Sequence, residues 1–68
     1  MRHYTVLIID CDIVSATSHA TLDDALARLQ ALFGAAVDLV DVALGVLAIG
    51  QHVDQVANQC CFQVTRNN

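Results

Sequence analysis

The stretch from Thr21 to Gly34 constrains the fold most, because all of its local signals indicate a helix. Thr21 is a preferred N-cap residue, and Asp24 follows three positions later, as in a capping box. Asp24 and Arg28 are four residues apart on the outer face and can pair. Gly34 can adopt the left-handed conformation that ends a helix. The apolar face consists of Leu22, Ala25, Leu26, Leu29, Leu32 and Phe33. We therefore predict a helix over 21–33.

The segment before this helix has the composition of a strand. Residues 4–9 are rich in β-branched side chains and are apolar on both faces, which is typical of a central strand. Every second residue from Tyr4 to Ile8 shares one face. The polar residues 10–12 predict a turn, after which 13–16 can pair back as a short strand.

The stretch after the helix gives conflicting signals. It is apolar and β-branched, which favours strands at 36–43 and 46–53, with a turn near Gly45. The alternative is a second helix, because apolar residues also recur at helical spacing between Val37 and Leu44.

The last strand is predicted at 60–65, where apolar and polar residues alternate from Cys60 to Val64 and the apolar ones face inward. Residues 54–58 are predicted to form a turn. The whole chain, 1–68, then forms a single α+β domain. We expect one antiparallel sheet of three to four strands with one helix packed on one face, in the order β-α-β-β-β.

The charged residues are unusual in kind. All seven acidic residues are aspartate, all three basic residues are arginine, and the formal net charge is −4. Such a surface repels nucleic-acid phosphates and attracts a basic protein surface. An alternative is that the aspartates only keep a small domain with 56% apolar residues in solution.

The cysteines do not form a disulfide framework. Cys11, Cys60 and Cys61 are odd in number, and no C-x-x-C spacing is present. No signal peptide is visible near Met1, and Asp38 and Asp41 interrupt the longest apolar stretch, which argues against a membrane span. We expect a cytoplasmic protein.

No motif for catalysis or for a cofactor is visible. The cysteines and histidines lack zinc-ligand spacing, and nothing in the sequence places Cys60 or Cys61 beside His52 as a nucleophile and base. There is no phosphate-binding loop and no dinucleotide fingerprint. We predict a non-enzymatic protein with no cofactor, no metal site and no catalytic residue.

The first half of the chain resembles the HicB antitoxin family. The strand Tyr4-Thr5-Val6-Leu7-Ile8 matches the Y-x-V-x-I strand of that family, and Thr21 to Leu29 matches its T-x-x-E-A helix. The glycine-rich hairpin that joins the two elements in that family is missing. This resemblance implies an antitoxin or a regulatory partner of a small basic toxin.

In size, acidity and element order the whole chain also resembles the small anti-CRISPR proteins encoded by phages. That resemblance implies an inhibitor that binds a CRISPR effector complex at the basic surface that reads the protospacer-adjacent motif (PAM), as a DNA mimic. The partner would be a protein rather than a nucleic acid or a membrane, and monomer and homodimer both stay open. The candidate contacts are Asp10, Asp12, Asp23, Asp24, Asp38 and Asp41.

Overall fold

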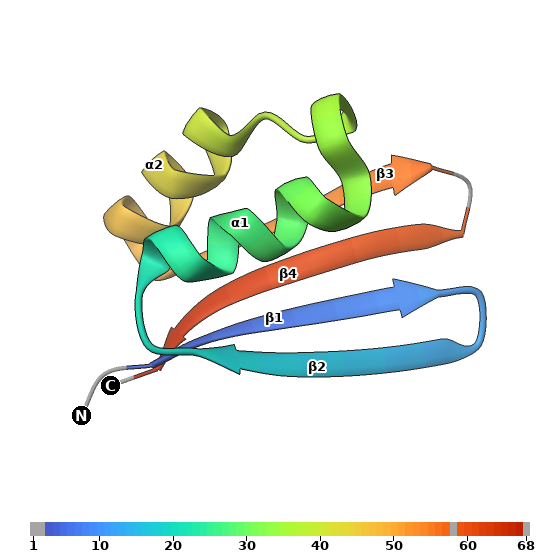
Figure 1. The fold of residues 1–68 in the computed structure, drawn as a ribbon, viewed down its shortest axis with the longest axis horizontal. Helices are drawn as coiled ribbons and strands as arrows, with labels where there is room; N and C mark the ends of the chain where they lie inside the picture. Colours follow the sequence, from blue (N-terminus) through green and yellow to red (C-terminus); the bar gives the residue numbers. More distant parts are fainter. Residues whose placement is uncertain (1–2, 58, 68) are drawn as a thin grey trace.

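The computed structural model describes residues 3–57 and 59–67. Over this part of the chain, four strands and two α-helices form an α+β fold (Figure 1), and the predicted fold class is confirmed. The elements are β1 (His3–Asp10), β2 (Ile13–His19), α1 (Leu22–Phe33), the short 3-10 helix η1 (Gly34–Ala36), α2 (Leu39–Ile49), β3 (Gln51–Ala57) and β4 (Cys60–Asn67).

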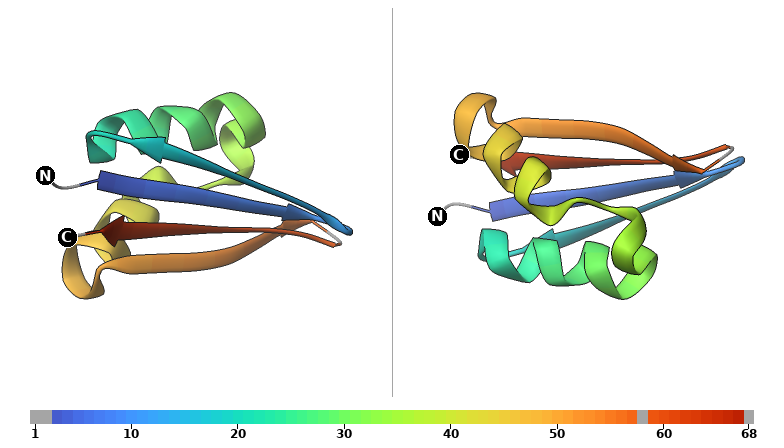
Figure 2. Two further views of the ribbon diagram at one scale, coloured as in Figure 1. Left: turned by 90° about the horizontal axis from the view of Figure 1, so that it is seen from below. Right: turned by 90° about the horizontal axis from the view of Figure 1, so that it is seen from above.

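The strands form one open antiparallel sheet in the order β2-β1-β4-β3. β1 is therefore a central strand, as its two apolar faces predict. Both helices lie on the same face of the sheet, and the two views in Figure 2 show the opposite face uncovered. The molecule thus has two layers, with β2 and β3 as open edges.

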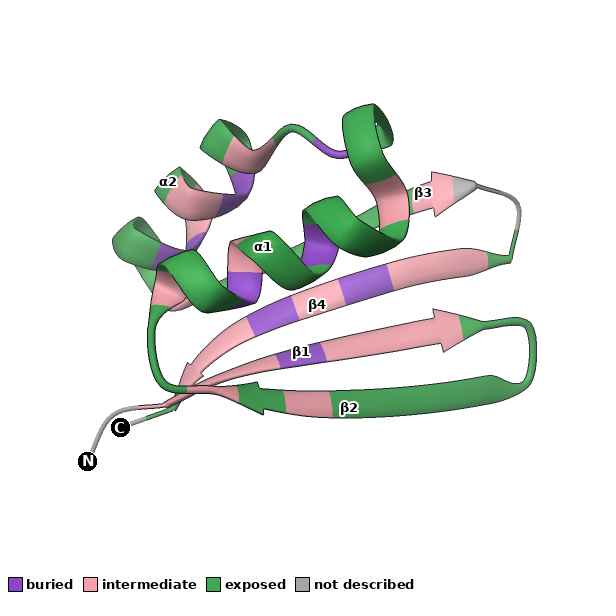
Figure 3. Cartoon of the chain, in the orientation of Figure 1, coloured by how far each residue is buried: buried purple, intermediate pink, exposed green. Residues whose placement is uncertain are grey.

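The core lies between the helices and the sheet (Figure 3). Phe62 and Val64 on β4 are buried, as predicted for the inward face of the last strand, and Val6 on β1 is buried beside them. The rings of Phe33 and Phe62 pack with centroids 5.9 Å apart. The complete set of buried residues is Val6, Ala25, Leu29, Val37, Val42, Val46, Phe62 and Val64.

The predicted helix is confirmed as α1. The Thr21 side chain accepts a hydrogen bond from the Asp24 amide at 3.1 Å, and Gly34 has a φ of 58° at the C-terminal end. One residue of its expected apolar face differs, because Leu32, in the last turn of the helix, is 44% exposed. The carboxylate of Asp24 contacts His19 rather than Arg28.

The predicted strands at 36–43 and 46–53 are wrong over most of their length, because residues 39–49 form the second helix, α2. Asp38 caps this helix by accepting hydrogen bonds from the amides of Val40 and Asp41. Gly50 ends it with a φ of 85°, and its amide donates to the carbonyl of Val46. The predicted order β-α-β-β-β is therefore corrected to β-β-α-α-β-β, and two helices rather than one cover the sheet.

Gly45 allows α2 to approach β3 closely. A Cβ atom at this position would lie 2.9 Å from Nδ1 of His52 and 3.3 Å from its Cβ. The His52 ring stacks on Phe62, with centroids 5.9 Å apart and an interplanar angle of 24°. The glycine that suggested a turn is thus a packing requirement inside a helix.

The strand boundaries also differ from expectation. The turn at 10–12 is present, but β2 extends to His19, because it pairs with β1 along its whole length. Residues 54–57 belong to β3 rather than to a turn, and Asn58 lies outside the described residues. No helix in the described part of the chain is long and apolar enough to cross a membrane.

Candidate partner-binding site

The six aspartates predicted to contact a partner lie in three separate places. Two flank the turn between β1 and β2, two lie in the first turn of α1, and two lie at the start of α2. Figure 1 shows the β1–β2 turn and the start of α1 at opposite ends of the sheet. The structure therefore does not bring the six residues together in one row. The pairs are Asp10 with Asp12, Asp23 with Asp24, and Asp38 with Asp41.

Two of these carboxylates have local structural roles. Oδ2 of Asp24 lies 2.9 Å from Nδ1 of His19, and the other ring nitrogen of His19 lies 2.8 Å from the Thr17 hydroxyl. This pattern fits a ring whose Nδ1–H donates to Asp24 while Nε2 accepts from Thr17. Asp38 is the N-cap of α2, and both of its capping hydrogen bonds go to Oδ1. Both residues therefore stabilise the fold.

The turn between β1 and β2 is tied to the turn between β3 and β4. The amide of Cys11 donates to the carbonyl oxygen of Gln59 at 2.7 Å, and the Cys11 thiol donates to Gln59 Oε1 at 2.9 Å. These residues are 48 positions apart in sequence. Two hydrogen bonds between the same two residues restrict how the turns can move relative to each other. We call this end of the sheet the turn tip and define it as Asp10, Cys11, Asp12 and Gln59.

The backbone of the turn tip is strained. Cys11 has a φ of 56° and Gln59 a φ of 65°, and among the described residues they are the two non-glycine residues with a positive φ. A side chain in this left-handed region costs roughly 1–2 kcal/mol relative to glycine. Strain of this kind concentrates at functional sites, where the surrounding structure maintains it. Here the two strained residues are hydrogen-bonded to each other.

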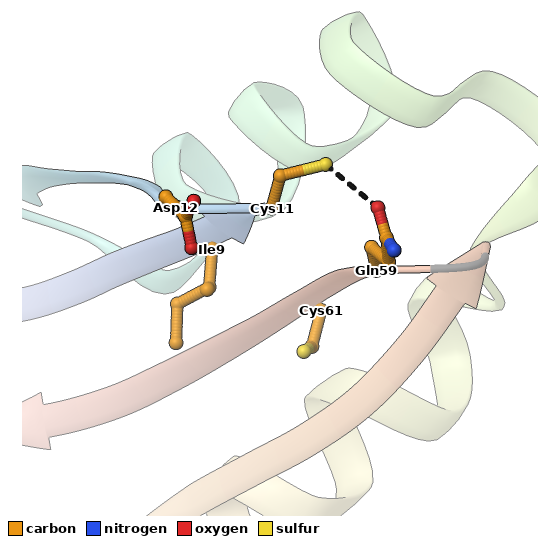
Figure 4. Close-up of a pocket in the computed structure, with 5 residues that line it drawn as sticks. All are labelled: Ile9, Cys11, Asp12, Gln59 and Cys61. Carbon is orange, nitrogen blue, oxygen red and sulfur yellow. Dashed lines mark hydrogen bonds between the residues drawn. The ribbon is translucent and has the colours of Figure 1, made fainter.

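A hollow of about 390 Å³ lies beside the turn tip and is open to solvent. Figure 4 shows the hydrogen bond from Cys11 to Gln59 at this end of the sheet. Ile9 and Cys61 lie opposite each other on β1 and β4 and form the apolar part of the lining. The lining residues are Ile9, Cys11, Asp12, Gln59 and Cys61. Asp12 is the one acidic residue in this lining.

Asp10 and Asp12 are exposed on either side of Cys11. No side-chain hydrogen bond or ion pair joins either carboxylate to another described residue. Asp10 lies opposite Cys60 in the pairing of β1 with β4. Partial burial raises the pKa of the Cys60 thiol, and the negative charge of Asp10 raises it further. This thiol is therefore held in its protonated, less nucleophilic form at neutral pH.

The structure keeps the candidate nucleophiles away from their candidate base. His52 on β3 lies opposite Val64 on β4. Cys61 lies three residues from Val64 along β4, which is roughly 10 Å at the usual rise of a strand. Within the ranges 3–57 and 59–67, no three side chains of histidine, cysteine, aspartate or glutamate come close enough together to hold a metal ion. Asp10 and Asp12 are the exposed charged side chains of the turn tip.

Sequence reasoning identified both aspartates of this site but missed Gln59. Nothing in the sequence around it indicates a left-handed residue, since glycine and asparagine are the usual choices there. The contact with Cys11 arises only when the sheet brings the two turns together. Comparison with protein-family models, with curated proteins and with solved structures finds no match for this chain.

Proposed function

We propose that this protein is a small acidic inhibitor that binds a basic protein surface through the turn tip. The observation that carries the proposal is the pair of exposed carboxylates, Asp10 and Asp12, on a turn held by two hydrogen bonds to Gln59. A restrained pair of charges loses little conformational entropy on binding, so its attraction for a basic surface is retained as affinity. The formal net charge of −4 adds long-range attraction to such a surface.

The partner class comes from the anti-CRISPR resemblance in size and acidity, since the predicted element order, its third ground, is corrected by the structure. A PAM-reading surface is basic, because it holds the phosphates of a DNA duplex. Asp10 and Asp12, separated by one residue, would stand in for neighbouring phosphates of one strand. The inhibitor would occupy the surface before DNA reaches it, inside the bacterial cell. The proposal places the contact at one end of the molecule rather than along a row of six aspartates.

The test is an affinity capture from bacterial lysates that contain CRISPR effector complexes, at low and at moderate salt. The bait carries Asp10→Asn and Asp12→Asn, and the matched control carries Asp23→Asn and Asp54→Asn. Each variant loses two negative charges, and all four substituted side chains are exposed. We expect the turn-tip variant to lose about tenfold or more in affinity, equivalent to roughly 1.4 kcal/mol, while the control keeps most of its binding.

Equal losses in the two variants would mean that only overall charge matters, which would contradict a role for the turn tip. Capture that does not fall as salt rises would contradict an electrostatic interface. Recovery of a small basic toxin in place of an effector subunit would favour the antitoxin function and reject the CRISPR partner.

A further inference from the structure

The second helix is apolar on both of its sides. Val42 and Val46 face the core and are buried. On the opposite side, Val40, Leu44 and Leu47 are 69%, 61% and 59% exposed. We call these three residues the α2 stripe. A helix that is apolar all round is typical of a position buried on both sides, but the two-layer fold covers only one side of α2.

The α2 stripe is continuous. Its members are spaced i, i+4 and i+7, so they lie one above another on a single side of the helix. Because Val42 and Val46 on the other side of the helix are buried in the core, this side faces away from the core. The stripe is formed only by α2, whereas the proposed contact at the turn tip is formed by the two hairpin turns. A partner at one surface therefore does not compete for residues of the other.

We propose that a second copy of this chain covers the α2 stripe, with the two α2 helices antiparallel across a two-fold axis. The stripe is close to symmetric about Leu44, which lies at the middle of the 11-residue helix, because Val40 is four residues before it and Leu47 three residues after it. In this arrangement Leu44 meets its own copy on the axis, and Val40 lies within one residue of Leu47 of the second copy. A two-fold interface requires this kind of self-matching surface.

The charges at the two ends of α2 are also complementary in this arrangement. Asp38 caps the start of the helix through Oδ1 alone, which leaves Oδ2 for another contact. Arg66 lies at the end of the helix, where its amide donates to the carbonyl of Gly50 at 2.8 Å. Its Nη2 lies 3.8 Å from the position that a Cβ on Gly50 would occupy. Antiparallel pairing about Leu44 brings Asp38 of each copy opposite Gly50 and Arg66 of the other.

The size of the α2 stripe determines how stable the dimer is expected to be. A helix of 11 residues is about 16 Å long and only three of its side chains form the stripe, so the paired surface is small for a specific interface. We therefore expect a dimer that dissociates on dilution. Dimers through the open face of the sheet or through the edge strand β2 are the competing arrangements. Val53 represents the open face at 61% exposed, and Ile13 represents β2 at 71% exposed.

The experiment is sedimentation equilibrium of the full chain over a wide concentration range, with three variants. Leu44→Glu places two like charges together on the proposed axis. Val53→Glu is its matched control, because both side chains are 61% exposed, and Ile13→Glu tests the β2 edge. We expect the unchanged chain to approach twice its mass of 7.3 kDa and Leu44→Glu to stay monomeric with an unchanged circular dichroism spectrum. The two control variants should dimerise like the unchanged chain.

A chain that stays at 7.3 kDa at the highest concentration would overturn the proposal. So would loss of the dimer in either control variant while Leu44→Glu still dimerises. If Leu44→Glu fails to fold, Leu44→Cys replaces it, in a chain whose own cysteines are changed to Ser or Ala. Mild oxidation should join two such chains across the axis, and Val53→Cys in the same background should not be joined. Equal joining of both variants would reject the axis.

A pair of milder variants tests the charge complementarity. Asp38→Asn keeps a good N-cap but removes the charge, and Arg66→Gln removes the opposite charge. Each is expected to weaken dimerisation several-fold, and the double variant should be little weaker than either single variant. Fully additive losses would show that these two residues do not face each other across the axis.

Discussion

The two helices pack on the same sheet, but only α1 has a polar outer side. α1 is apolar toward the sheet and presents Asp23, Arg28 and Gln30 outward, so its sequence has the ordinary pattern of a surface helix. α2 presents Val40, Leu44 and Leu47 outward. α1 therefore has a clear amphipathic pattern in the sequence, because its outer side is polar. The helical pattern of α2 is harder to recognise, because apolar residues lie on its inner and its outer side.

The largest expected effect contrasts the inner side of α1 with the outer side of α2. Leu29 is fully buried, so Leu29→Ala should lower the free energy of unfolding by about 2–5 kcal/mol. Leu47 is 59% exposed, so Leu47→Ala should cost less than about 1 kcal/mol in dilute solution. Urea denaturation at low protein concentration measures both. Similar losses would mean that Leu47 is already buried within a single chain.

The contrast between the helices also explains what the sequence predicted well. Thr21 and Gly34 delimit α1 with strong cap signals, and β1 and β4 have clear strand patterns. α2 has comparable caps in Asp38 and Gly50, but its valines and Gly45 favoured strands. Glycine is required at position 45 of the helix because a Cβ atom there would collide with His52, and this requirement arises from tertiary packing.

The edges of the fold and the site were predicted only in part. Thr17 to His19 lie beyond the strand predicted at 13–16 and become part of β2 because β1 offers them a pairing partner. Asp10 and Asp12 were recognisable from their charge and from the turn between them. Gln59 was not recognisable, because its role depends on a contact between turns 48 residues apart. Patterns along the chain do not encode which turns meet.

The second expected effect concerns the close approach of α2 to β3. In an open helix, Gly45→Ala would add up to roughly 1 kcal/mol of stability. Here the added methyl group would lie 2.9 Å from His52 Nδ1, so we expect a net loss of about 1–2 kcal/mol from overpacking. Thermal and urea denaturation measure the change. In a His52→Ala background the same substitution should be neutral or stabilising, and a persisting loss would contradict the steric explanation.

The third effect compares the two N-caps. Thr21→Ala and Asp38→Ala should each cost about 1 kcal/mol, because each removes the acceptor for backbone amides in the first turn. Amide hydrogen exchange should locate the losses, at Asp24 for the first variant and at Val40 and Asp41 for the second. Asp38→Asn should restore most of the loss on α2, since asparagine caps as well as aspartate. Failure of this rescue would mean that the charge, and not the cap, matters at this position.

The smallest effect is expected on the outer side of α1. Gln30→Ala changes an exposed side chain on a polar face, so the free energy of unfolding should change by less than about 0.5 kcal/mol. The mass in solution should equal that of the unchanged chain at every concentration. A shift in mass with this variant would place α1, rather than α2, at an interface and would reverse the comparison between the helices.

The most direct test of the uncovered side of α2 is the exposure of its methyl groups to a soluble paramagnetic probe, measured by NMR at low and high protein concentration. The account predicts that the methyls of Val40, Leu44 and Leu47 become shielded as the concentration rises, while those of Val53 and Ile13 stay exposed. Methyls of the α2 stripe that remain as exposed as Val53 at every concentration would contradict it.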